Sequence, residues 1–101
     1  MDYKEIFLPT SLSTINPIDD NIDVIITLED GKSYVLVVAT PQNLLSLMKK
    51  ENSSFLSAGC PLAFVEVLTE ENIEAVVKSF CSDNAYWLKY YHYAGEDMNG
   101  G

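Results

Sequence analysis

The clearest pattern along the chain is a pair of apolar runs separated by a short polar stretch. The runs span residues 22–28 and 33–39, and both are rich in β-branched residues. The Asp30-Gly31 pair between them is typical of a two-residue hairpin turn, because both central positions of that turn favour positive φ. The sequence therefore predicts an antiparallel hairpin.

The hairpin has a definite register if Asp30 and Gly31 form the turn, because Glu29 then lies opposite Lys32 as a cross-strand charge pair. One face becomes wholly apolar, and we expect it to pack against helices. It carries Ile22, Val24, Ile26 and Leu28 from the first strand and Val35, Val37 and Ala39 from the second. The other face is mixed and carries Asp23, Ile25, Thr27, Glu29, Lys32, Tyr34, Leu36 and Val38.

Two helices are predicted from their start signals and from the spacing of their apolar residues. Thr40 as N-cap and Pro41 at the first helical position begin a helix that ends at residues 49–50, where two lysines suit the helix dipole. Its apolar stripe comprises Leu44, Leu45, Leu47 and Met48. The second helix begins after Thr69 and ends at residues 82–84. Its apolar positions are Ile73, Val76, Val77 and Phe80.

The remaining segments complete an α+β fold. A third strand is expected over residues 62–68, starting from Pro61, and residues 3–8 favour a short edge strand closed by Pro9. Residues 9–21 read as loop. The order ββαβα predicts a two-layer sandwich: an antiparallel sheet, two helices packed on one face, and a further edge strand at each end. Residues 1–101 form one domain, with 95–101 as a flexible tail.

An aromatic segment near the end of the chain allows two structures. Five of the eight residues from 86 to 93 are aromatic, which favours a strand, while Asn84 as an N-cap favours a short helix. We expect the strand. Alternate residues would then face opposite ways, so that one set completes the core while the other contacts a partner. The two sets are Tyr86, Leu88, Tyr90 and His92, and Trp87, Lys89, Tyr91 and Tyr93.

The charge of the chain excludes some classes of function. Fifteen acidic residues face six lysines and no arginine, which gives a net charge of −9. Nucleic-acid binding requires clustered cations, and arginine above all, so a direct nucleic-acid contact is excluded. The same charge repels anionic lipid and attracts a basic protein. The six-residue run 34–39 is the longest apolar one and is too short to span a membrane, and the acidic N-terminus does not resemble a signal peptide, so we expect a cytoplasmic protein.

No motif for catalysis or metal binding stands out. Cys60 and Cys81 have apolar neighbours and are predicted to be buried thiols. His92 is the only histidine and is expected at the surface, and the spacing of these three residues gives no support for a zinc site, so no metal or cofactor is expected. The chain shows no nucleophile–base pair and no phosphate loop, which argues against an enzyme.

Three segments of the chain resemble a known group of proteins. They are residues 23–34, which include the Asp30-Gly31 turn, residues 39–44, which include Thr40-Pro41, and residues 64–73, which include Thr69-Glu70-Glu71. The chain is similar to small bacterial proteins found beside polymorphic toxins, in particular the immunity proteins of contact-dependent growth inhibition systems. The resemblance implies a cytoplasmic antitoxin that binds a toxic domain, often a nuclease. It assigns no contact residue by motif.

The candidate partner-binding residues therefore follow from charge and aromatic character alone. They are Asp19, Asp20, Asp23, Glu66, Glu70, Glu71, Glu74, Tyr86, Trp87, Tyr90, Tyr91 and His92. The favoured function is an immunity protein, a monomer until it binds a cognate basic toxin and occludes its active site. Two alternatives stay open: an adaptor or regulatory domain that dimerises through its aromatic edge strand, and a small enzyme that uses a carboxylate pair.

Overall fold

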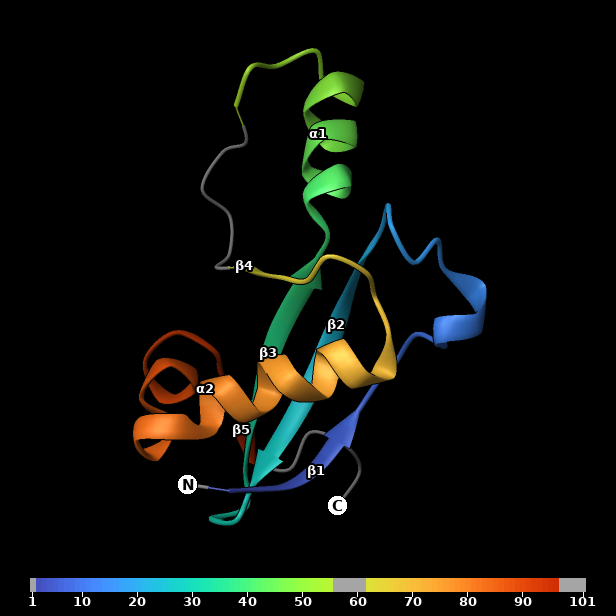
Figure 1. The fold of residues 1–101 in the computed structure, drawn as a ribbon. Helices are drawn as coiled ribbons and strands as arrows, with labels where there is room; N and C mark the ends of the chain where they lie inside the picture. The colour runs from blue at the N-terminus through green and yellow to red at the C-terminus, as the bar shows by residue number, and fades with distance from the viewer. Residues whose placement is uncertain (1, 56–61, 97–101) are drawn as a thin grey trace.

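The computed structural model describes residues 2–55 and 62–96 and confirms the predicted α+β two-layer architecture (Figure 1). A five-stranded sheet is combined with two main helices and one short 3₁₀ helix. In chain order the elements are β1 (Tyr3–Phe7), η1 (Leu12–Thr14), β2 (Asn21–Leu28), β3 (Lys32–Ala39), α1 (Pro41–Lys50), β4 (Leu62–Phe64), α2 (Glu70–Tyr91) and β5 (Tyr93–Glu96).

The sheet is built around β3, which has neighbours on both edges. The strand order is β1-β2-β3-β4, and β5 also pairs with β3. On its outer edge, β3 pairs antiparallel with β5 over residues 32–34 and parallel with β4 over residues 37–39. The sheet is therefore antiparallel except for β4, which follows α1 as a crossover connection. The edge strand predicted near the N-terminus is present as β1, whereas the final strand, β5, begins only at Tyr93, near the end of the segment predicted to form it.

The β2–β3 hairpin forms as predicted, but its register differs by one residue. Thr27 pairs with Ser33 and Ile26 with Tyr34, so the loop has three residues rather than two, and Glu29 does not lie opposite Lys32. The Gly31 N–H donates to the Leu28 oxygen at 3.0 Å, and Gly31 has φ +83°. This is the pattern of a turn closed by one left-handed glycine, in which Asp30 needs no positive φ.

A one-residue shift exchanges the faces of β3. The buried face of the hairpin carries Ile22, Val24, Ile26 and Leu28 with Tyr34, Leu36 and Val38, whereas Val35 and Val37 share the opposite face with Ile25 and Asp23. The prediction for β2 was correct and that for β3 was wrong. Seven residues of the correct face are at most 3% exposed, which shows that burial has selected this register.

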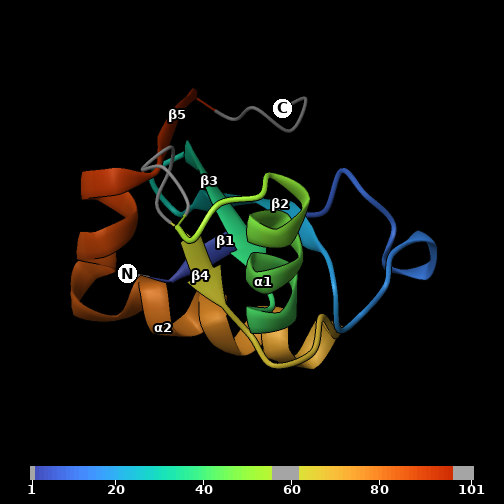
Figure 2. The same ribbon diagram turned by 90° about the horizontal axis from the view of Figure 1, so that it is seen from above.

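The core lies between the sheet and α2, which crosses one face of it (Figures 1 and 2). Thr69 caps this helix by accepting from the Asn72 N–H at 3.1 Å. Ile73 and Val77 are fully buried against the sheet, and Val76 and Phe80 pack at the margin, as their spacing predicted.

Helix α1 occupies a different position from the one expected. It begins at Pro41 after the Thr40 N-cap, as predicted, but it extends beyond the end of β3 rather than lying flat on the sheet (Figure 1). Its apolar stripe is only partly covered, since Leu45 is 59% exposed, and the buried residue of the helix is Asn43. Polar contacts rather than apolar packing hold its first turn.

The predicted third strand is shorter than expected. Strand β4 ends at Phe64, although the Val65 N–H still donates to the Ala39 oxygen at 3.0 Å. Pro61 and Cys60 lie outside the described residues. Gly95 and Glu96 were predicted to belong to a flexible tail, but both are part of β5, and residues 97–101 lie outside the described part of the chain.

The aromatic segment was wrongly predicted as a strand over residues 85–91. Helix α2 breaks at residues 82–85 and then resumes through Tyr91, so the alternative of a short helix was correct. Ser82 has extended backbone, and Asp83, Asn84 and Ala85 all have φ between 53° and 58°, which forms one left-handed turn. A strand begins only at Tyr93. Within residues 2–55 and 62–96, no helix is long and apolar enough to cross a membrane.

Candidate functional site

The structure distributes the twelve predicted binding residues over three places. The loop before β2 contains Asp19 and Asp20, and β2 itself contains Asp23. Glu66 precedes α2, whose first two turns carry Glu70, Glu71 and Glu74. The other end of α2 carries Tyr86, Trp87, Tyr90 and Tyr91, and His92 follows its last residue. The acidic group and the aromatic group therefore occupy opposite ends of α2 (Figure 1). They do not form one surface patch around a single point.

Asp19 has a structural role that sequence reasoning missed. Its carboxylate accepts from the Ser46 hydroxyl at 2.8 Å and from the Asn43 side-chain amide at 3.3 Å, so it joins the loop before β2 to helix α1. The Asn43 amide oxygen in turn accepts from the Asn21 amide at 2.8 Å. Because Asn43 is only 8% exposed, these contacts satisfy a buried polar group.

Asp20 and Asp23 differ in their surroundings. The half-buried Asp20 accepts from the Asn21 N–H at 2.9 Å and from the Asn16 N–H at 3.4 Å, so its carboxylate organises its own loop. Asp23 is exposed on β2, on the sheet face opposite α2. Of these three acids, only Asp23 presents its carboxylate to solvent without a hydrogen bond that stabilises the loop.

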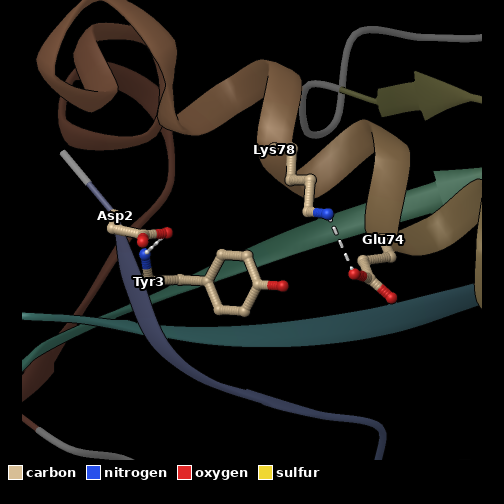
Figure 3. Close-up of polar contacts among 4 residues, drawn as sticks. All are labelled: Asp2, Tyr3, Glu74 and Lys78. Atoms are coloured by element: carbon tan, nitrogen blue, oxygen red, sulfur yellow. Dashed lines mark hydrogen bonds and ion pairs between the residues drawn. The ribbon is translucent and has the colours of Figure 1, made fainter.

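The start of α2 carries the densest group of carboxylates. Glu70 and Glu71 are exposed on the first turn, where the helix dipole stabilises negative charge, and Glu66 is exposed just before it. Glu74 forms an ion pair with Lys78 one turn later, with 3.1 Å between Oε1 and Nζ (Figure 3). The hydrogen bond to Glu74 raises the pKa of Lys78, with smaller contributions from Tyr3 and Asp2.

Strand β1 lies beside this ion pair. The Tyr3 side chain points toward Glu74 and Lys78, while the Asp2 carboxylate accepts from the Tyr3 backbone N–H at 2.9 Å (Figure 3). Asp2 and Tyr3 thus lie next to the acidic end of α2.

A hollow of about 360 Å³ opens between β1, η1 and the first turns of α2. Its wall is apolar and its rim is acidic. It is lined by Ile6, Leu8, Leu12, Ile73, Glu70 and Glu74. Sequence reasoning missed this hollow, because three of its residues belong to a segment interpreted only as an edge strand and a loop. Ile6 and Leu8 are two positions apart, so they share one face of an extended segment, and this spacing was the available signal for an apolar face there.

Tyr86 and Tyr90 form a parallel stack at the other end of α2. Their ring centroids are 5.5 Å apart and the rings are inclined by 3°. The contact depends on helical i, i+4 spacing, which the predicted strand would not supply. Both rings are substantially exposed, Tyr86 by 44% and Tyr90 by 69%, and line a shallow hollow with Asp83, Asn84 and Lys89. The side chains of Trp87 and Tyr91 lie outside the described part of the structure.

His92 is buried, so the expectation of a surface histidine was wrong. Its side chain is 8% exposed, its Nδ1 lies 3.0 Å from the Val35 oxygen, and its ring packs edge-on against Phe80 with centroids 5.7 Å apart. Burial lowers the pKa of His92, although the hydrogen bond to Val35 opposes this effect. His92 therefore stabilises the junction of α2 with the sheet and does not belong to an exposed binding surface.

The described residues offer no metal site. No group of three His, Cys, Asp or Glu side chains within residues 2–55 and 62–96 is placed to hold an ion. Cys81 is buried in the core, as predicted, and burial raises the pKa of its thiol.

Comparison with known proteins adds no relative. No family model matches the chain, and neither a curated protein nor a solved structure matches it.

Proposed function

We propose that this chain is an immunity protein, a non-catalytic inhibitor that binds a basic toxin domain in the bacterial cytoplasm and occludes its active site. The observation that carries the proposal is the group of exposed carboxylates at the start of α2, on a chain of net charge −9 without arginine. A surface of this sign attracts a cationic partner over several ångströms and repels nucleic acid.

A nuclease is the class of toxin that this surface suits best. Its substrate groove carries cations that bind phosphates, and carboxylates can pair with the same cations. Glu70 and Glu71 are exposed on one turn of a capped helix, so their backbone positions are rigid. An inhibitor with ordered carboxylates loses less conformational entropy on binding than one with a mobile acidic tail.

The tyrosine pair supplies a second contact surface. Exposed tyrosines contribute strongly at interfaces because they bury a large area with few rotatable bonds. Tyr86 and Tyr90 lie at the end of α2 away from the glutamates, so a partner that reaches both must span the length of that helix (Figure 1).

The alternative is a non-enzymatic adaptor that dimerises through its aromatic segment. Residues 86–91 are helical, so such a dimer would join helices through Tyr86 and Tyr90 rather than add strand to strand. Sedimentation velocity over a hundredfold concentration range separates the two functions. A monomer at all concentrations supports the inhibitor, and a concentration-dependent dimer supports the adaptor.

The decisive experiment uses the reading frame directly upstream. Its C-terminal domain is expressed in a laboratory bacterium with and without this chain, and growth is measured. We expect growth arrest without the chain and rescue with it. The proposal fails if that domain is harmless or if rescue is absent.

The electrostatic part of the proposal has its own control. The triple variant E70Q/E71Q/E74Q removes three charges at the start of α2, and E5Q/E29Q/E51Q removes three exposed charges elsewhere. We expect the first variant to slow association with the toxin domain about tenfold and the second to slow it much less. Association that does not change between 50 and 500 mM salt would contradict the electrostatic account.

A further inference from the structure

The hollow between β1 and α2 combines an apolar wall with an acidic rim. Four aliphatic side chains form its wall, and three of the four, Ile6, Leu8 and Leu12, are half-buried and come from β1, the loop after it and η1. Glu70 and Glu74 form its rim. A purely apolar ligand would leave these carboxylates beside a dry surface, and a purely ionic ligand would leave the aliphatic wall in water.

The net charge around the rim favours a cation. Glu70, Glu71 and Glu74 contribute three negative charges. Lys78 neutralises one of them through its 3.1 Å ion pair with Glu74, and the positive end of the helix dipole offsets about half a charge. About one and a half negative charges remain.

We infer that this hollow is the docking point for one arginine of the partner, together with an aliphatic residue next to it. The aliphatic part packs against Ile6, Leu12 and Ile73, and the guanidinium pairs with Glu70 and Glu74. The inference rests on the proposed function, because it names the place where a basic partner is held.

The size and chemistry of the hollow select this occupant. A volume of about 360 Å³ lies at the lower end of the range for ligand pockets, so it suits one or two side chains rather than a whole helix. Arginine suits it better than lysine, because a guanidinium is more weakly hydrated, lies flat on apolar surface and pairs with two carboxylate oxygens at once.

A peptide titration tests the inference without the toxin. The probe is the blocked tetrapeptide acetyl-Ala-Leu-Arg-Ala-amide, added to the full ¹⁵N-labelled chain and followed by ¹H–¹⁵N correlation spectra. We expect shifts confined to β1, η1 and the first two turns of α2. The counterpart with citrulline in place of arginine keeps the shape without the charge, and we expect it to bind about fivefold more weakly.

Three variants separate the contributions of charge and shape. E70Q/E74Q should weaken the arginine peptide about fivefold, and the matched variant E29Q/E51Q should leave its affinity unchanged. Leu12→Trp should fill the hollow and abolish binding while the glutamates remain. Equal binding of both peptides, shifts elsewhere on the molecule, or equal effects of the two double variants would overturn the inference. The citrulline comparison decides the matter even if Leu12→Trp does not fold.

The failures of the two proposals are distinguishable. If the peptide binds in the hollow but the upstream domain is harmless, the site stands and the immunity function fails. If the chain neutralises that domain and Leu12→Trp, shown to be folded by its spectrum, does so with unchanged affinity, the function stands and the hollow is not the docking point.

Discussion

One residue, His92, satisfies both backbone polar groups of Val35. The Val35 N–H donates to the His92 oxygen at 2.9 Å, and the Val35 oxygen lies 3.0 Å from His92 Nδ1. Val35 lies between the parts of β3 that pair with β5 and with β4, so His92 covers a gap in the ladder. A carbonyl oxygen can only accept, so Nδ1 carries the hydrogen.

Replacement of His92 should therefore destabilise the fold more than loss of an exposed histidine would. We expect His92→Ala to lower the free energy of unfolding by about 2–3 kcal/mol, because it leaves the Val35 oxygen without its donor and removes the contact with Phe80. His92→Asn should lose less, since its side-chain amide can donate from nearly the position of Nδ1. Urea unfolding measures both, and equal losses would show that the hydrogen bond contributes nothing.

The same residue predicts a pH dependence of stability. Burial lowers the pKa of His92 in the folded chain below its ordinary value of about 6.5. Between the two values the unfolded chain binds the proton more tightly, so the free energy of unfolding should fall as the pH drops through 6.5 and level off below the folded pKa. The difference between the native chain and His92→Asn, measured from pH 8 to pH 5, isolates this contribution from that of the carboxylates. A constant difference would contradict it.

The position of helix α1 should depend on the polar contacts of Asn43. Asn43→Ala removes the acceptor of the Asn21 amide and one donor to Asp19, and we expect a loss of about 1–3 kcal/mol. Gln42, the adjacent residue, is exposed, and Gln42→Ala should change stability by less than about 0.5 kcal/mol. Chemical denaturation of the two variants is the measurement. A larger effect at residue 42 would show that the polar network does not anchor the helix.

The left-handed turn inside α2 gives a prediction at a single position. Asn84 is exposed and has φ 58°, a conformation that asparagine tolerates and β-branched residues avoid. Asn84→Val should cost about 1–2 kcal/mol in thermal or urea unfolding, whereas Asn84→Gly should stay within about 0.5 kcal/mol of the native chain. If valine is tolerated as well as glycine, the turn does not have this backbone conformation.

Local signals in the sequence correctly predicted those features of the fold that short-range contacts determine. Thr40-Pro41 and Thr69 mark the helix starts, and each threonine accepts the N–H three residues later. The register of the hairpin was not predictable from Asp30-Gly31 alone, because the pair suits both a two-residue and a three-residue loop. The three-residue loop is favoured because it buries Tyr34 and Leu36, and their burial depends on the whole core.

The aromatic segment shows a different limit. Its composition favours a strand, but Ala85 is fully buried within the left-handed turn, and Leu88 is fully buried on the helix that resumes after it. The acidic end of α2 was predictable because acids at a helix start have a local cause. The hollow beside it was not, because Ile73 lies more than sixty residues from the Ile6 and Leu12 that face it.

The shared outer edge of β3 has a consequence for synthesis of the protein on the ribosome. Hairpin β2–β3 is local and can form early, but its exposed edge needs residues 62–64 and then residues 92–96. Until residues 92–96 leave the exit tunnel, the nascent chain exposes unpaired backbone N–H and C=O groups on the outer edge of the apolar strand β3. Other chains can pair with these groups. Premature truncation near residue 90 should thus yield an aggregating product, even though most of the core is already encoded.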